Sequence, residues 1–165
     1  MPKAAWIMGS DSDLPALTKG IKLLKDFGVE VEATVLSAHR TPNEAASFAA
    51  LARDNGFEVI IAAAGKAAHL AGVLAAYTTL PVIGIPMKSS ALEGLDALLS
   101  TVQMPPGVPV ATVAIDGAEN AAILAVQILA LKYSDLTKKL DEYKAAMAKS
   151  VADKDKKVKQ EVTML

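Results

Sequence analysis

The feature that most constrains this chain is the regular alternation of short apolar runs with longer amphipathic segments. Five short runs end at glycine, proline or polar residues and predict β-strands: Ala4–Met8, Val29–Leu36, Val59–Ala64, Pro81–Pro86 and Val108–Ile115. Apolar residues at helical spacing predict the intervening helices: Leu14–Phe27, Pro42–Asn55, His69–Tyr77, Leu95–Val102 and Ala118–Leu131. Alternation of this kind predicts an α/β protein with a central parallel sheet, because each crossover places a helix on one face of the sheet. We expect a three-layer sandwich, flavodoxin-like or Rossmann-like.

The C-terminal part of the chain follows a different pattern. A last helix is predicted from Ser134, with an apolar stripe formed by Leu136, Leu140, Tyr143 and Met147. Beyond Val151 the sequence is rich in charge and lacks a clear stripe, so we expect fraying or disorder there. We therefore divide the chain into an α/β catalytic domain, residues 1–133, and a C-terminal helix with a charged tail, residues 134–165. The stripe needs a partner surface, either this domain or another subunit.

Composition narrows the possible functions. The 165 residues carry a formal net charge of −1, which argues against non-specific binding of nucleic acid. Cysteine is absent, so disulfides, thiolate nucleophiles and zinc–thiolate sites are excluded. No apolar run approaches the roughly 18 residues that a membrane span needs, and the N-terminus has no hydrophobic signal region. We expect a cytoplasmic protein that contacts neither membranes nor nucleic acid.

Three polar loops follow predicted strands, namely Gly9–Asp13, Ser37–Pro42 and Gly65–Leu70. In open parallel sheets the ligand crevice lies beyond the carboxyl ends of the strands. We therefore expect the three loops to converge on one site. None of them is a dinucleotide-binding G-x-G-x-x-G sequence or a P-loop, so ATP hydrolysis is not expected.

The second loop carries the strongest catalytic signal. Ser37, His39 and Arg40 join a hydroxyl, an imidazole and a guanidinium within four residues. Imidazole exchanges a proton near neutral pH, and a guanidinium binds anionic groups. We predict that His39 is a general acid/base beside an anionic substrate bound by Ser37 and Arg40. A solvent-exposed or turn-stabilising ring is the structural alternative for a lone loop histidine.

The first loop could bind a sugar phosphate. Its backbone amides and the Ser10 and Ser12 hydroxyls could cradle a phosphate at a helix start, and Asp13 could accept hydrogen bonds from sugar hydroxyls. Simple capping of the following helix is the alternative.

The third loop could contact a carboxylate. Gly65 permits close approach of a ligand, and the helix that follows has N-terminal amides. Alternatively, the small residues serve tight helix–sheet packing, and His69 is merely a capping or partly buried residue. Lys66 could add positive charge at the mouth of the site or point into solvent.

Longer stretches of the sequence match one enzyme family in register from about Ala4 to about Leu131. They are Met8–Asp13, Ser37–Pro42, Ala67–Leu70 with Gly72, Leu80–Pro86, Gly94–Ser100, Val102–Pro105, Gly107–Thr112 and Asn120–Ala122. On these segments the chain resembles the class I N5-carboxyaminoimidazole ribonucleotide mutases of bacterial purine biosynthesis. That family converts N5-carboxyaminoimidazole ribonucleotide into 4-carboxy-5-aminoimidazole ribonucleotide without metal, nucleotide or organic cofactor.

The resemblance implies roles for individual residues. His39 would handle the proton at C4 of the substrate imidazole, and Asp13 would hold the ribose hydroxyls. The Gly65–Leu70 loop would form the wall around the migrating carboxylate or carbon dioxide, in a closed pocket. The full set implied to bind this small-molecule substrate is Ser10, Ser12, Asp13, Ser37, Ala38, Arg40, Gly65, Ala67, His69 and Leu70. The resemblance also implies a homo-octamer in which the final helix packs on a neighbouring subunit. Many of these mutases have glycine where this chain has Lys66.

Other functions stay open. A related class of the same fold carboxylates aminoimidazole ribonucleotide directly with carbon dioxide. It typically has lysine after the loop histidine and lacks the Ala-Ala-His-Leu sequence, so Arg40 and His69 favour the mutase. A non-catalytic sugar-phosphate or nucleotide sensor would bind ligand without converting it. A flavin-binding electron carrier is disfavoured because Trp6 and the Tyr and Phe residues do not cluster near the loops.

Overall fold

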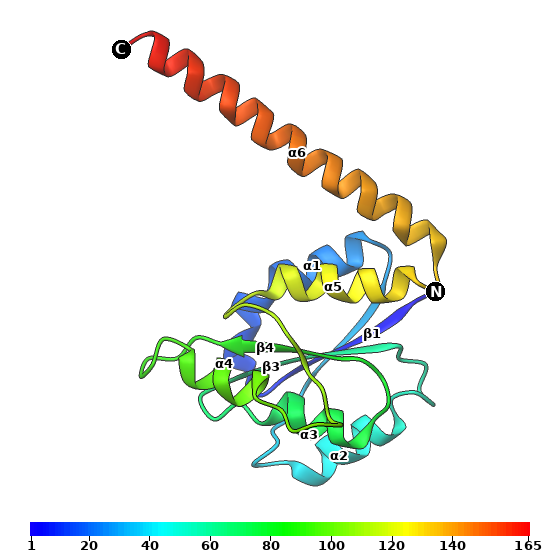
Figure 1. The fold of residues 1–165 in the computed structure, drawn as a ribbon. Coiled ribbons are helices and arrows are strands. Elements are labelled where there is room, and N and C mark those ends of the chain that lie inside the picture. Colours follow the sequence, from blue (N-terminus) through cyan, green and yellow to red (C-terminus); the bar gives the residue numbers. More distant parts are fainter.

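A computed structural model describes all 165 residues and contains one parallel five-stranded sheet (Figure 1). The strands are β1 (Lys3–Met8), β2 (Glu30–Val35), β3 (Val59–Gly65), β4 (Val82–Met87) and β5 (Ala111–Thr112). Their order across the sheet is β2-β1-β3-β4-β5, and every neighbouring pair is parallel. This is the flavodoxin-like order, which confirms the predicted fold class.

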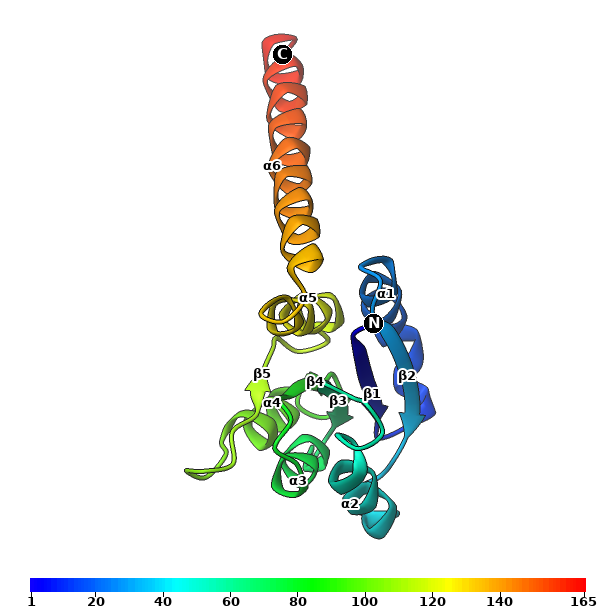
Figure 2. The ribbon, with the colours of Figure 1, turned by 90° about the vertical axis from the view of Figure 1, so that its right-hand side faces the viewer.

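Helices cover both faces of the sheet. They are α1 (Leu14–Asp26), α2 (Pro42–Leu51), α3 (Leu70–Tyr77), α4 (Leu95–Val102), α5 (Ala118–Ala130) and α6 (Ser134–Thr163), with a short 3₁₀ helix η1 (Asp11–Asp13) before α1. Figure 2 shows α1 and α5 on one side of the sheet and α2 and α3 on the other. Side chains of β1 alternate between the two resulting cores, with Trp6 in one and Ile7 in the other.

Two predicted elements of the α/β domain are several residues longer than the observed ones, whereas the bounds of the others agree to within one residue. The predicted strand Val108–Ile115 is reduced to the two residues of β5, because Pro109 lacks an amide donor and Asp116 turns the chain with a φ of +56°. The predicted helix Pro42–Asn55 ends at Leu51, and Gly56 then reverses the chain with a φ of +82°.

The prediction of a frayed or disordered tail beyond Val151 is wrong. Helix α6 continues without a break to Thr163 and projects away from the sheet (Figure 1). Its distal half contains no glycine or proline. Pairs of opposite charge four residues apart support it, with Lys159 Nζ 2.7 Å from Asp155 Oδ2 and Lys157 Nζ 3.8 Å from Glu161 Oε1. Local helix propensity therefore replaces tertiary packing in this segment.

The beginning of α6 is anchored to the body. Leu136 is fully buried, and Leu140 and Tyr143 pack against the same core as α1 and α5. Lys139 Nζ donates a 2.6 Å hydrogen bond to the Phe27 carbonyl, and the Tyr143 and Phe27 rings lie 5.7 Å apart. None of the helices combines the length and apolar character that a bilayer span requires.

The contact between α1 and α5 depends on Gly20. A Cβ atom at this position would lie 2.7 Å from Trp6 Cη2 and would overlap the Ala118 backbone. Trp6 is fully buried, so neither neighbour has room to move.

We therefore expect Gly20→Ala to destabilise the protein by about 1–2 kcal/mol, although alanine favours helix more than glycine does. Urea denaturation would measure the change. Lys19→Ala, on the exposed side of the same helix, is the matched control and should stay within about 0.5 kcal/mol of wild type. A Gly20→Ala variant as stable as wild type would show that the helices can separate without cost.

Candidate functional site

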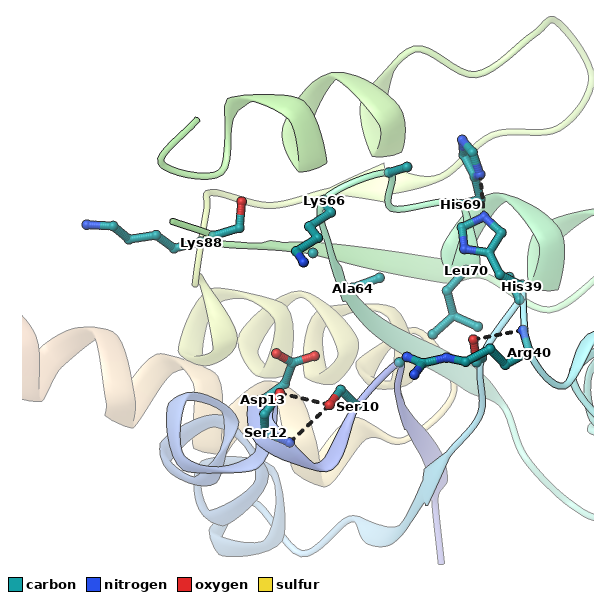
Figure 3. Close-up of a pocket in the computed structure, with 16 residues that line it drawn as sticks. Ser10, Ser12, Asp13, His39, Arg40, Ala64, Lys66, His69, Leu70 and Lys88 are labelled. Carbon is teal, nitrogen blue, oxygen red and sulfur yellow. Dashed lines mark hydrogen bonds between the residues drawn. The ribbon is translucent and has the colours of Figure 1, made fainter. Parts of the chain in front are cut away.

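A cavity of about 340 Å³ lies at the carboxyl ends of the strands (Figure 3). The end of β3, the start of α3 and the loops that follow β1, β2, β3 and β4 supply its sixteen lining residues: Gly9, Ser10, Ser12, Asp13, Ser37, Ala38, His39, Arg40, Ala64, Gly65, Lys66, Ala67, His69, Leu70, Lys88 and Ser89. All eleven residues that the sequence proposed for the site are among them. The three loops therefore meet as expected.

The first loop begins where β1 ends beside β3. The Gly9 amide donates a 2.9 Å hydrogen bond to the Ala63 carbonyl and so ties the loop to the neighbouring strand. The Ser10 and Ser12 hydroxyl oxygens lie 2.8 Å apart, and Ser10 Oγ also accepts a 3.3 Å bond from the Ser12 amide. Ser10 thus caps η1, the alternative noted for this loop, while its hydroxyl also lines the cavity.

Asp13 precedes α1 but does not cap it, because its side chain makes no hydrogen bond to the first turn. Its carboxylate is half-buried and lines the cavity. Burial, followed by the negative charges of Asp116 and Asp11, raises the pKa of the Asp13 carboxyl. The ionised Asp13 carboxylate is therefore poorly stabilised in the folded protein. A ligand that donates hydrogen bonds from hydroxyl groups would stabilise it.

The second loop is held by its own hydrogen bonds. Thr41 Oγ1 donates to the Ser37 carbonyl at 3.1 Å and accepts from the Ser37 amide at 2.9 Å, while the Arg40 amide donates to Ser37 Oγ at 3.1 Å. Pro42 then opens α2 with a φ suited to the first helical turn. The Arg40 guanidinium has no carboxylate partner within the chain and lies beside the cavity (Figure 3).

The two histidines of the chain are in direct contact. His39 Nε2 lies 2.8 Å from His69 Nδ1, and the two rings are nearly perpendicular, at 83°. Such a contact needs a proton on one nitrogen and a free lone pair on the other, so each ring constrains the tautomer of its partner. Both rings are exposed in the single chain, so the expected closed pocket is open here.

The third loop contains an unusual backbone conformation. Lys66 directly follows β3 and has a φ of +56°, the left-handed region that glycine adopts most readily. Leu70, at the start of α3, is buried in the core and therefore serves helix–sheet packing, which was the structural alternative for this loop. The same residue also borders the cavity. His69 precedes α3 without capping it, which leaves the ring free for His39.

The loop after β4 supplies residues that the sequence analysis did not propose. Lys88 and Ser89 line the cavity, as do Gly9 and Ala64 beside the three expected loops. The rule that ligands bind beyond strand ends applies equally to β4, and it could have identified Lys88 and Ser89. No group of three or more His, Asp and Glu side chains is arranged to hold a metal ion.

Comparison with known proteins identifies the family. The family model described as AIRC, AIR carboxylase, matches residues 3–150. This chain belongs to that family. Two relatives, both named N5-carboxyaminoimidazole ribonucleotide mutase, come from Pyrococcus abyssi and Thermotoga maritima. The first is 60% identical over 89% of this chain and 84% of the relative. The second is 52% identical over 97% and 94%.

A further member of the family has another name. The Saccharomyces cerevisiae protein named phosphoribosylaminoimidazole carboxylase is 50% identical over 95% of this chain, which matches only 28% of that longer protein. Among solved structures, Treponema denticola PurE has a TM-score of 0.84 at 28% identity and is matched over 95% of this chain and 98% of its own. The type II dehydroquinase of Propionibacterium acnes, at 12% identity and a TM-score of 0.53, shares the fold alone.

The raised pKa of Asp13 gives a stability prediction. An Asp whose pKa is higher in the folded chain than in the unfolded chain lowers stability wherever it is ionised in both states. We expect Asp13→Asn to raise the melting temperature at pH 7, and the gain should disappear below about pH 4, where the unfolded chain also binds the proton. Thermal unfolding across this pH range is the measurement.

The exposed Asp54 supplies the control for this experiment, and Asp54→Asn should show no such pH-dependent gain. An Asp13→Asn variant less stable than wild type at pH 7 would mean that the carboxylate makes a favourable interaction in the free protein.

Proposed function

We propose that this protein is an N5-carboxyaminoimidazole ribonucleotide mutase, which moves the carboxylate of its substrate from N5 to C4 of the aminoimidazole ribonucleotide in purine biosynthesis. The relatives that carry this name at 52–60% identity match nearly the whole chain. The observation that supports the chemistry most directly is the 2.8 Å contact between His39 and His69 at the wall of a cavity that also contains Arg40.

The reaction requires one group that moves a proton. The N5–carboxylate bond breaks and releases carbon dioxide, and C4 of the imidazole then forms a new bond to it. The proton lost from C4 balances the proton gained by N5. We assign this transfer to His39, whose contact with His69 orients its ring and holds its tautomer. The reaction involves no net oxidation or reduction, and we propose no cofactor.

We assign the remaining groups by the chemistry of the substrate. The Ser10, Ser12 and Ser37 hydroxyls and the Arg40 guanidinium suit a phosphate, since together they supply several donors and one full positive charge. Asp13 suits the ribose hydroxyls. Backbone around Ala38, Gly65, Ala67 and Leu70 completes the wall on the side of the reacting carboxylate.

The test of the proton-transfer role is His39→Asn. We expect turnover of N5-carboxyaminoimidazole ribonucleotide to fall by about a hundredfold to ten-thousandfold, while the carboxylated product still binds. A spectroscopic assay at saturating substrate and a binding titration give the two measurements. Glu44→Gln, an exposed change in the first turn of α2, is the control. Turnover near that of wild type in His39→Asn would remove the proposed role.

Direct carboxylation is the second candidate, favoured by the name of the yeast relative. In that case the protein would consume 5-aminoimidazole ribonucleotide with bicarbonate and would leave the N5-carboxylated compound unchanged. Assays with each substrate separate the two reactions. Tight binding of both ribonucleotides without conversion of either would instead indicate a sensor.

We also propose that residues 1–133 carry out the chemistry and that residues 134–165 hold copies of the chain together in a homo-octamer. The apolar stripe of α6 continues past the body: Met147, Val151, Val158 and Val162 share one side of the helix and are 47%, 65%, 56% and 62% exposed. A neighbouring subunit would cover this stripe. A cytoplasmic location is consistent with a phosphorylated, charged substrate.

Lysines placed on the stripe should weaken the assembly. We expect Met147→Lys combined with Val151→Lys to give a smaller particle by light scattering at equal protein concentration, because burial of the added charges is unfavourable. Ala145→Lys combined with Ala152→Lys adds the same charge on the opposite side of α6, where both alanines are exposed, and should not change the assembly. Equal particle sizes for both pairs would contradict a role for the stripe.

A further inference from the structure

Three features distinguish Lys66, and no contact within the folded chain accounts for them. Its backbone has a φ of +56°, a conformation that costs a residue with a Cβ atom more than it costs glycine. Its side chain lines the cavity, and Figure 3 shows it directed from the end of β3 into the space above Asp13. It forms no ion pair with any carboxylate of the chain.

The other lysine that lines the cavity, Lys88, already has a carboxylate partner. Lys88 is paired with Glu93, and Figure 3 shows its ammonium group turned away from the other lining residues. Arg40 and Lys66 are therefore the two basic side chains of the cavity without a carboxylate partner, one on the loop after β2 and one on the loop after β3. A ligand with two separate anionic groups matches this arrangement.

The loop on which Lys66 lies, which also carries His69, selects one of those anionic groups. Arg40 shares its side of the cavity with serine hydroxyls, which together suit the phosphate. Lys66 shares its loop with His69, whose ring contacts the proposed acid/base His39. We propose that Lys66 is a positioning residue that binds the migrating carboxylate of the substrate and of the product. This inference rests on the proposed function and adds a specificity determinant to it.

The chemistry predicts how such a cation affects the kinetics. The carboxylate is charged in the substrate and in the product, but it is neutral carbon dioxide between the two bond changes. A cation therefore favours the bound substrate and product more than the species between them. Its removal should weaken binding of both carboxylated compounds without lowering the rate of the chemical step.

The experiment compares Lys66→Met with wild type in binding and in turnover. We expect the Kd for 4-carboxy-5-aminoimidazole ribonucleotide and the KM for N5-carboxyaminoimidazole ribonucleotide to rise roughly three- to tenfold, because the pair is exposed to solvent. The kcat should not fall. The Kd for 5-aminoimidazole ribonucleotide, which has the phosphate but no carboxylate, should stay within a factor of two. Lys66→Arg keeps the charge and should restore most of the binding of the carboxylated compounds.

Two controls separate charge from backbone effects. Lys66→Gly removes the charge and the strained backbone together, so it should lose the same carboxylate binding as Lys66→Met without a lower melting temperature. Lys25→Met removes an exposed lysine at the end of α1, away from the cavity, and should change neither constant.

Three outcomes would overturn the inference. An unchanged Kd for the carboxylated product would show that Lys66 does not contact it. An equal loss for the compounds with and without the carboxylate would assign Lys66 to the phosphate. A large fall in kcat would assign it to the chemical step. Because the binding measurements need no turnover, an absence of mutase activity would contradict the proposed function and leave this test in place.

Discussion

The site depends on the parallel pairing of β1 with β3. Met8 lies beside Ala63 in the register of these strands, and the Gly9 amide continues the pairing by bonding to the Ala63 carbonyl. Because the strands are parallel, their following loops leave the sheet at the same edge. Strand β2 pairs with the other side of β1 in register, so its loop reaches that edge too. Each loop is short, and a slip in the pairing would separate the serine hydroxyls from the histidines.

This dependence explains why the site could be predicted from the sequence in outline. The glycine and polar residues that end β1, β2 and β3 mark the edge of the sheet, and the strand order brings those three ends together. The contact between His39 and His69 could not be predicted in this way. It depends on side-chain directions in two loops that are 30 residues apart, and the sequence pattern indicates only which loops meet.

Two site residues, the short strand β5 and the helical end of α6 were not predicted from the sequence, each for a different physical reason. Lys88 and Ser89 lie in a loop that has neither a histidine nor a glycine-rich stretch, so its sequence has no pattern that predicts a site. Strand β5 is short because proline interrupts its hydrogen bonding, an effect that its apolar pattern does not reveal. The charged end of α6 lacks a stripe dense enough to predict helix, but its spacing of opposite charges and its freedom from glycine and proline support one.

The cavity concentrates features that a chain selected only for stability would avoid. Asp13 is half-buried without a partner, Lys66 has a left-handed backbone, and Arg40 and both histidines are exposed at its wall. The rest of the fold supports these groups with well-packed aliphatic cores on both faces of the sheet. A ligand that carries hydroxyls and two anionic groups would satisfy Asp13, Arg40 and Lys66 at once. Side chains that have no partner in the free protein would thus gain one in the complex. A site of fixed polar groups selects in this way for the ligand whose charges and hydroxyls pair with all of them.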